Sequence, residues 1–356
     1  MSFHGGNIVA TAKDLGCDVN DLIDMSSNLT PLGAVPGLHE SIISSLDQIA
    51  YLPETGSETL VEKFAEKYGI KKNQIMAGNG TTEFIFALPA ISDCNRAVIV
   101  NPTYSDYRLA CEWQQLPVDN FILKYEEKFC LNLEKLSSQL KGGELVFVCN
   151  PNNPTGVLTA SGDILQCAVE NPDSTFLVDE SYLPFTREKS LLHYELPENL
   201  YILCSFSKIY GIPGLRLGFI ISFVENIQKF VGQRKPWGVN RVAQMSGEFL
   251  LDHGGHYQEE VVCFLEKYKN NFVQQLNNIN CVDVVPGNAN FILCHLRGDI
   301  SVDLLHTKML EKKIMIRNCN TFEGLEDHFF RISLKDERSN NYCLLALQEI
   351  LGTECE

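Results

Sequence analysis

The segment SFSKIYGIPGLRLG, residues 205–218, places one lysine, Lys208, between hydroxyl side chains and an arginine. Ser205 and Ser207 lie three positions and one position before Lys208, and Arg216 lies eight positions after it. A lysine attacks a carbonyl only when unprotonated, and burial or crowding lowers its pKa toward that state. Hydroxyls and a guanidinium suit a dianionic phosphate. The segment therefore favours a ligand with both a carbonyl and a phosphate, although alone it fits equally well a strand and turn with a surface lysine.

A second motif is the turn NPNNPTG at residues 150–156, which follows the apolar run LVFVC at 145–149. The run is typical of a buried parallel strand. Two X-Pro steps and a glycine favour a tight turn at its carboxyl end, the edge where α/β sheets bind ligands. Asn153 could donate its amide to a ring oxygen there, whereas the alternative is a turn that only connects two elements.

A third motif is a carboxylate, Asp179, at the end of the apolar run 176–178, with Tyr182 three residues later. A carboxylate beside a pyridine nitrogen keeps that nitrogen protonated, so that the ring accepts electrons. The phenol of Tyr182 would then reach the oxygen on the same ring. The alternative is an aspartate that caps the next helix.

Two further segments contain groups that suit a flat, phosphorylated ring. Gly80 and Thr81 open an apolar stretch, and a helix beginning there would point backbone N–H groups at an anion. Tyr104 in the run NPTYSDY, residues 101–107, could stack on the ring. Simple helix capping and ordinary aromatic packing are the respective alternatives.

Taken together, these motifs resemble the fold-type I enzymes of the class I/II aminotransferase superfamily, which depend on pyridoxal 5′-phosphate (PLP). The resemblance implies an α/β fold in which a large domain has a mostly parallel, seven-stranded-type sheet between helices, with a smaller α/β C-terminal domain. It implies that the catalytic residues are Lys208, which binds the cofactor covalently, Asp179 at the pyridinium nitrogen, and Tyr182. The implied cofactor contacts also include Gly80, Thr81, Tyr104, Asn153, Ser205, Ser207 and Arg216.

The flanks of the chain are similar to the threonine-phosphate decarboxylases of cobalamin biosynthesis. The residues that carry this likeness are the early run His4-Gly5-Gly6-Asn7, then Asn28, Arg317 and Arg331. Histidinol-phosphate aminotransferases, a neighbouring family, generally lack the early run. The resemblance implies that Arg331 and Asn153 bind a substrate carboxylate and that Arg317 and His4 bind its phosphate. Gly5 and Asn28 would add hydrogen bonds, and the division of the two anions among these residues stays open, as does a role of the arginines in surface ion pairs.

The implied reaction is decarboxylation of O-phospho-L-threonine, or of the related O-phospho-L-serine, to an amino-alcohol phosphate. An aminotransferase acting on histidinol phosphate or another amino acid is the alternative, because both reactions use the same residue types. A non-catalytic regulator with the same fold is a third possibility, but intact Lys208, Asp179 and Arg216 argue against it. Members of the superfamily are typically homodimers, and Tyr51 is expected to reach the partner's cofactor phosphate, although from the sequence alone it could equally belong to the core.

Composition limits the possible partners. The chain has 45 acidic and 29 basic side chains, a net charge of −16, which argues against nucleic acid and anionic membranes. Its 13 cysteines have no CxxC spacing, so reduced thiols in a cytoplasmic protein are expected. No zinc-like ligand set is present, and His253-Gly254-Gly255-His256 is expected to form a loop. No apolar run approaches the roughly 20 residues needed to span a bilayer.

The pattern along the chain predicts three parts. Residues 1–40 are expected to pack on the small domain, 41–235 to form the large PLP-binding domain and 236–356 the small C-terminal domain. Helices are predicted at 38–50 and 57–69, and at 237–275 with a break at Gly254-Gly255. Strands are predicted at 97–100, 145–149, 176–178, 200–205 and 217–222, and in the small domain at 282–285, 291–296, 314–317 and 329–334.

Overall fold

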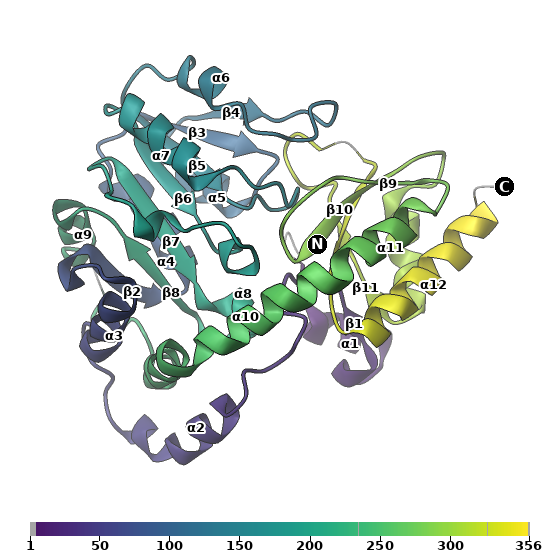
Figure 1. The fold of residues 1–356 in the computed structure, drawn as a ribbon, viewed down its shortest axis with the longest axis horizontal. Helices are drawn as coiled ribbons and strands as arrows, with labels where there is room; N and C mark the ends of the chain where they lie inside the picture. Colours follow the sequence, from purple (N-terminus) through teal and green to yellow (C-terminus); the bar gives the residue numbers. More distant parts are fainter. Residues whose placement is uncertain (1–4, 234, 326, 355–356) are drawn as a thin grey trace.

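The computed structural model describes residues 5–233, 235–325 and 327–354. A large α/β part is built on a seven-stranded sheet, and a smaller part on a four-stranded antiparallel sheet (Figure 1). Helix α10, Arg241–Asn277, runs from one part to the other across the middle of the molecule (Figure 1). The predicted α/β fold with a mostly parallel large sheet is confirmed.

The large sheet has the strand order β2-β8-β7-β6-β5-β3-β4. Strands β7, β6, β5, β3 and β4 pair in parallel, and only β8 pairs antiparallel with its neighbours β2 and β7. Residues of β5 and β8 are buried throughout, as expected for strands with helices on both faces. The strands of this sheet are β2 Ile75–Asn79, β3 Arg96–Asn101, β4 Val118–Ile122, β5 Glu144–Cys149, β6 Thr175–Asp179, β7 Leu200–Ser205 and β8 Leu217–Ile221.

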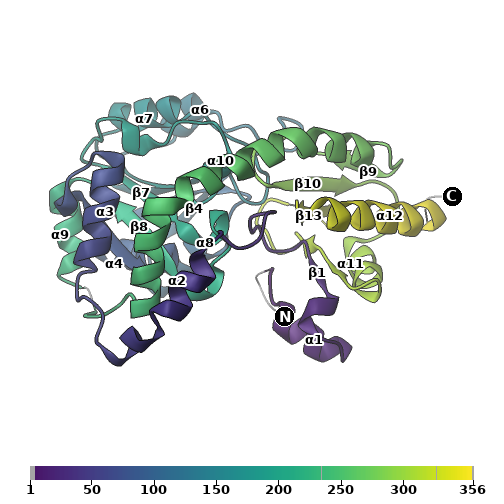
Figure 2. The same cartoon turned by 60° about the horizontal axis from the view of Figure 1, so that its bottom comes forward.

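The smaller sheet has the order β12-β13-β10-β9 and is antiparallel throughout. A separate two-stranded sheet joins the two ends of the chain, since β1 pairs in parallel with β11 through Ile23 and Ile314. Figure 2 shows α1 and β1 beside this smaller part. These strands are β1 Ile23–Asp24, β9 Val282–Val284, β10 Phe291–Leu296, β11 Ile314–Met315, β12 Arg317–Asn318 and β13 Phe329–Ser333.

Helices cover the sheets and bury an apolar stripe against them; in α3, for example, Leu60, Val61 and Phe64 are buried. The predicted helix at 38–50 is divided into α2 and a 3₁₀ helix, Leu46–Ala50. The other helices besides α10 are α1 Ile8–Leu15, α2 Leu38–Ser44, α3 Glu58–Tyr68, α4 Thr81–Ile91, α5 Asp106–Trp113, α6 Leu133–Ser137, α7 Ser161–Glu170, α8 Phe206–Ile209, α9 Val224–Val231, α11 Val302–Glu311 and α12 Glu337–Glu354.

The predicted break at Gly254-Gly255 was wrong, because α10 is continuous through both glycines and through His253 and His256. Glycine inside a helix costs only about 1 kcal/mol relative to alanine, so packing can override it. At Gly254, an added Cβ would lie 2.7 Å from Cε1 of Tyr210. This glycine therefore allows close contact with the turn after Lys208 and does not end the helix.

The single strand predicted at 314–317 was also wrong. Ile314 and Met315 form β11 and pair with β1, whereas Arg317 and Asn318 form β12 and pair with β13. The chain thus changes sheet at Ile316, which has no place in either ladder. This change turns Arg317 toward Arg331, its direct partner on β13.

Candidate active site

Two adjoining cavities, each of about 120 Å³, lie beyond the carboxyl ends of β5, β6 and β7. They share Tyr104, Asn153, Tyr182 and Lys208, so we treat them as two halves of one site. The inner cavity is lined in addition by Thr81, Thr82, Tyr107, Cys149, Asp179, Ser181, Ser205, Ser207 and Arg216. The outer cavity is lined in addition by Gly5, Ser26, Ser27, Asn28, Ser105, Arg317, Phe322 and Arg331.

Lys208 lies in the short helix α8, directly after β7, and borders both cavities. Burial, together with the positive charges of Arg331 and Arg216, lowers the pKa of Lys208 to about 8. About a tenth of the side chain is thus a neutral amine at pH 7, far more than at the ordinary pKa of 10.5. This is the form that attacks a carbonyl.

Asp179 ends β6 and is buried beside two hydrogen-bond donors. Tyr107 Oη donates to Asp179 Oδ2 at 2.8 Å, and the backbone N–H of Ser181 donates to Oδ1 at 2.9 Å. Burial raises the pKa of this carboxyl despite these bonds. A cation placed against it would offset that burial, which is what a protonated ring nitrogen offers.

Arg216 and the start of α4 form the end of the inner cavity that is suited to bind a phosphate. Arg216 adopts a left-handed backbone conformation, with φ 58°, and its Nη2 donates to Thr82 Oγ1 at 3.4 Å. Gly80 allows this approach, since an added Cβ would lie 2.4 Å from Arg216 Nη2. Ser205 and Ser207 complete the wall, and the Ser207 N–H donates to Ser205 Oγ at 3.3 Å. Hydroxyls, a guanidinium and a helix start thus converge on one end of the cavity.

Asn28, Tyr182 and Asn153 form the wall between the two cavities. Asn28 Nδ2 donates to Tyr182 Oη at 3.2 Å, and burial raises the pKa of Tyr182 to about 12. Asn153 Oδ1 accepts a hydrogen bond from Arg331 Nη1. Within the described part of the chain, Asn153 Nδ2 has no hydrogen-bond partner, so it remains available as a donor to a ligand.

The outer cavity contains two neighbouring guanidinium groups, those of Arg331 and Arg317. Arg331 Nη2 donates to the carbonyl of Ser26 at 2.7 Å, and its Nε has no partner among the described residues. Arg317 Nη2 donates to Thr321 Oγ1 at 2.8 Å, and Arg317 Cζ lies 5.3 Å from the ring centroid of Phe322. Burial lowers the pKa of both guanidinium groups, since a buried cation loses its hydration. An anionic ligand would compensate for this loss.

One predicted residue, Tyr51, is not brought into the site by the described structure. Tyr51 is 70% exposed and borders neither cavity. His4 lies outside the described residues. Gly5 does line the outer cavity, where an added Cβ would lie 2.7 Å from the carbonyl oxygen of Ser26.

The structure also reveals contacts that the sequence patterns did not predict. Tyr107 is the hydrogen-bond partner of Asp179, and Phe322 is an outer-cavity neighbour of Arg317. Asn290 Nδ2 donates to the carbonyls of Asn28 and Leu29, at 3.2 and 3.1 Å. These residues come from distant parts of the chain, and only the spacing of Tyr107 three positions after Tyr104 offered a sequence signal.

The side chains of the inner cavity fit PLP. The cofactor has an aldehyde, a pyridine nitrogen, a ring hydroxyl and a phosphate, and the cavity offers Lys208, Asp179, Tyr182 and the Arg216 group respectively. Among the described residues, no group of three or more His, Cys, Asp or Glu side chains could hold a metal ion. Nor does any described helix have the length and apolar character to cross a membrane.

The chain is similar to several known proteins over nearly its whole length. It is 31% identical over 360 residues to the threonine-phosphate decarboxylase of Salmonella typhimurium (strain LT2), covering 98% of this chain and 97% of that one. It is also 31% identical over 356 residues to the adenosylcobalamin biosynthesis bifunctional protein CobDQ of Leptospira interrogans, covering 98% of this chain. The chain spans only 41% of that longer protein. The histidinol-phosphate aminotransferase of Caldanaerobacter subterraneus is 28% identical over 339 residues, 92% of this chain and 93% of that one.

Solved structures of both kinds of enzyme share the fold. The L-threonine-O-3-phosphate decarboxylase of Porphyromonas gingivalis superposes with a TM-score of 0.84 at 26% identity, covering 93% of this chain and 100% of that one. The histidinol-phosphate aminotransferase of Clostridium acetobutylicum gives 0.85 at 28% identity, with the same coverage of 93% and 100%. The family model for aminotransferase class I and II matches residues 16–347. The chain therefore belongs to the PLP-dependent aminotransferase class I and II family.

Proposed function

We propose that this chain is a PLP-dependent carboxy-lyase that converts O-phospho-L-threonine into an amino-alcohol phosphate for cobalamin biosynthesis. The observation that carries the proposal is the pair of neighbouring guanidinium groups in the outer cavity, beside Lys208. A phosphorylated amino acid brings two anionic groups, a carboxylate and a phosphate, and arginine binds both through paired N–H donors. The 31% identity to a threonine-phosphate decarboxylase over 98% of the chain supports the same substrate.

In this proposal the inner cavity holds the cofactor. When bound, PLP supplies an electron sink for the charge that develops on the substrate's α-carbon. Asp179, with Tyr107 behind it, would keep the ring nitrogen protonated. Lys208 would bind the cofactor and later deliver a proton from its Nζ to the α-carbon. Tyr182 and Asn153 would hold the ring oxygen, and Tyr104 would stack on the ring. The phosphate would be held by Thr81, Ser205, Ser207 and Arg216, which line the cavity, and by Gly80 beside Arg216.

The outer cavity would hold and orient the substrate. We assign the substrate carboxylate to Arg331, whose Nε faces no partner within the described residues, with help from Asn153. We assign the substrate phosphate to Arg317 and His4, while Gly5 and Asn28 add hydrogen bonds. The bond that breaks is the one held perpendicular to the ring, so a decarboxylase must hold the carboxylate out of the ring plane. O-phospho-L-serine is a related candidate, because one methyl group is worth only about 1–3 kcal/mol in a pocket.

The second candidate is an aminotransferase for histidinol phosphate or another amino acid. It is supported by the structure of the histidinol-phosphate aminotransferase of Clostridium acetobutylicum, which superposes with a TM-score of 0.85. The decarboxylase of Porphyromonas gingivalis superposes equally well, with a TM-score of 0.84. Such an enzyme would hold the α-hydrogen out of the ring plane in the same site. A small rotation of the substrate thus separates the two reactions.

We also propose that the chain acts as a homodimer in the cytoplasm. Exposed apolar residues lie close together in the sequence, in α2 and in the segment after it that includes Tyr51: Ile43, Leu46, Ile49 and Leu52. An exposed apolar patch of this kind is typical of a protein interface. A second copy covering this patch would also bring Tyr51 against another protein surface. No disulfide joins any two of the 12 cysteines in the described residues, which suits a reducing compartment.

The experiment that tests the proposal is incubation of the PLP-loaded enzyme with O-phospho-L-threonine. Release of carbon dioxide without 2-oxoglutarate is expected. Transfer of the amino group to 2-oxoglutarate without carbon dioxide release would support the aminotransferase instead. Absence of both reactions with phosphothreonine, phosphoserine and histidinol phosphate would refute the decarboxylase and the histidinol-phosphate aminotransferase.

A further inference from the structure

Lys269 lies on α10, far along the chain from every predicted site residue, yet it holds a loop that contacts the site. Its Nζ donates to the carbonyl of Gly287 at 2.7 Å and to that of Ala289 at 2.6 Å. Burial lowers the pKa of Lys269 to about 8, so the ammonium form that donates to both carbonyls still predominates at neutral pH. One side chain thus fixes both ends of the tripeptide 287–289.

The loop held by Lys269 lies directly against the turn that carries Asn153. The backbone N–H of Asn288 donates to the carbonyl of Gly156 at 2.6 Å. The two backbones approach so closely that a Cβ added at Gly287 would lie 2.9 Å from the carbonyl oxygen of Thr155. Gly156 in turn donates its N–H to the carbonyl of Asn152 at 2.7 Å, next to Asn153. A continuous series of hydrogen bonds therefore leads from Lys269 to the Asn153 turn.

One side of the loop, which faces α10, borders a cavity, whereas Ala289 at the end of the loop is buried in the core. Pro286, Gly287 and Asn288 border a cavity of about 670 Å³, which Lys269 also lines. A loop that borders an open cavity lacks side-chain packing there, so its position depends on the hydrogen bonds that it makes. The two bonds from Lys269 cross this unpacked side.

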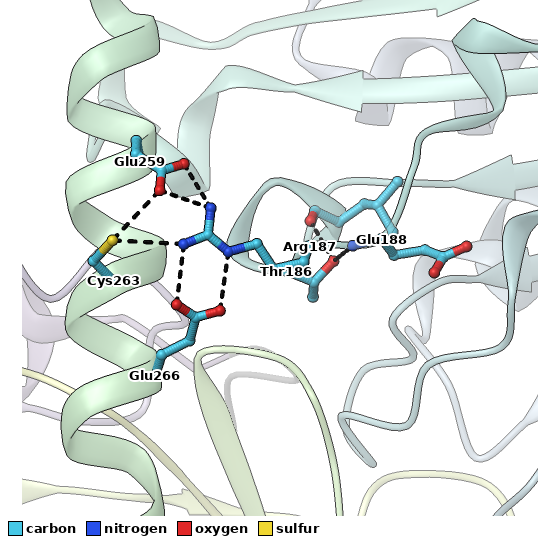
Figure 3. Close-up of polar contacts among 7 residues, drawn as sticks. Thr186, Arg187, Glu188, Glu259, Cys263 and Glu266 are labelled. Carbon is cyan, nitrogen blue, oxygen red and sulfur yellow. Dashed lines mark hydrogen bonds and ion pairs between the residues drawn. The ribbon is translucent and has the colours of Figure 1, made fainter.

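Helix α10 is itself fixed to the large part of the molecule at this level. Arg187, in the segment after Tyr182, binds two carboxylates of α10 (Figure 3). Its Nη1 donates to both oxygens of Glu259 at 2.7 Å, and its Nε and Nη2 donate to the two oxygens of Glu266 at 2.9 and 3.0 Å. Glu266 and Lys269 are three residues apart, so they lie on the same face of the helix. The ion pair of Glu266 with Arg187 and the hydrogen bonds of Lys269 to the loop therefore lie on the same side of α10.

We propose that Lys269 is a positioning residue that sets the placement of Asn153 through the 287–289 loop and Gly156. Asn153 borders both cavities and accepts a hydrogen bond from Arg331, so its placement affects how the substrate carboxylate is held. This inference rests on the proposed function for its kinetic part alone. Lys269 touches no cavity of the active site and is assigned no chemical step.

The test compares Lys269→Met, which keeps the aliphatic stem but removes the donors, with two other variants. Lys269→Arg retains N–H donors, and Lys267→Met removes a lysine from an exposed position of the same helix. Hydrogen–deuterium exchange of the PLP-loaded enzyme is followed in peptides covering residues 286–291 and 152–157. Faster exchange is expected in both peptides of Lys269→Met, with wild-type behaviour in Lys267→Met and at least partial recovery in Lys269→Arg. Unchanged exchange in Lys269→Met would overturn the proposal.

Steady-state kinetics then test whether Lys269→Met affects activity by changing the placement of Asn153. For whichever reaction the wild type catalyses, Lys269→Met is expected to raise KM about tenfold with a smaller change in kcat. In an Asn153→Ala background, the same change should alter kcat/KM less than about twofold, because coupled residues are not additive. An equal loss in both backgrounds would show that Lys269 acts elsewhere and overturn the assignment. The exchange measurement does not depend on the reaction, so a failure of the proposed decarboxylation is distinguishable from a failure of this inference.

Discussion

Arg317 and Arg331 are direct cross-strand partners on the antiparallel strands β12 and β13. Their side chains are largely buried, with 9% and 5% of each residue exposed. Like charges placed directly opposite one another destabilise a sheet, and burial adds to that cost. A protein keeps such a pair where an anion binds between or beside the two groups, and a phosphorylated amino acid carries two anionic groups.

The first prediction is a selective loss of substrate binding in Arg317→Ala. Its kcat/KM for phosphothreonine should fall by at least about tenfold, because a charge-assisted contact is worth roughly 1.5–3 kcal/mol. Unphosphorylated threonine should be a poor substrate for the wild type and lose little further. Steady-state kinetics with both substrates measure this, with the exposed Arg297→Ala as a control. Full activity of Arg317→Ala on phosphothreonine would refute the assignment, and so would loss of the cofactor.

A second prediction concerns the amine at the junction of the two cavities. The PLP-loaded protein should be yellow, and Lys208→Ala should lose both the absorption band of lysine-bound cofactor and all turnover. Absorption spectroscopy and the carbon dioxide assay measure the two effects. Wild-type turnover in Lys208→Ala would end the PLP interpretation.

The third prediction follows from the pKa of Lys208, which is about 8 in the folded protein against an ordinary value of 10.5. Below pH 8 the charged Lys208 is buried in the folded protein, which lowers the free energy of unfolding. Between pH 8 and 10.5 the unfolded chain binds more protons than the folded one, so the free energy of unfolding rises with pH and the destabilisation disappears. Cofactor-free Lys208→Met should therefore be about 1–3 kcal/mol more stable than wild type at pH 7. Denaturant unfolding should show this difference shrinking by pH 10, and a difference independent of pH would contradict the argument.

The fourth prediction tests the support of Asp179. Tyr107→Phe removes the 2.8 Å hydrogen bond to Asp179 Oδ2 but keeps an aromatic ring to stack on Phe147. Without that donor the pKa of the Asp179 carboxyl should rise further. The carboxylate would then take the shared proton more readily, and the ring nitrogen would be protonated for less of the time. We expect kcat to fall about tenfold while the cofactor stays bound. An unchanged kcat would mean that Ser181 alone suffices to stabilise the carboxylate.

The last prediction is that the protein is a dimer whose interface includes the exposed apolar residues near α2. Light scattering at assay concentration should give twice the chain mass, and Ile49→Glu combined with Leu52→Glu should shift it toward the monomer. Ile49 and Leu52 are 63% and 73% exposed in the single chain, so the substitutions should not disturb its core. A fully active monomeric wild type would contradict the expected role of Tyr51.

The sequence alone was sufficient for the parts of the site that are encoded locally. Asp179 ends an apolar strand, and Asn153 and Lys208 each follow another; parallel strands bring their carboxyl ends to one edge of a sheet. This physical rule needs no knowledge of pairing partners, and it places all three side chains at the inner cavity. The limits of the domains at residues 40 and 235, and the role of each site residue, stay predictions.

Only the tertiary structure decided relationships between distant segments. Gly254 lies inside the continuous α10, where Tyr210 packs closely against it, and the change of sheet at Ile316 depends on β1 from the other end of the chain. The opposition of Arg317 and Arg331 is likewise a matter of strand register. Hydrophobic periodicity and turn residues indicate the conformation of residues that are neighbours in the sequence. Strand register and close packing depend on which distant segment of backbone lies alongside, and a single sequence carries no local signal for that pairing.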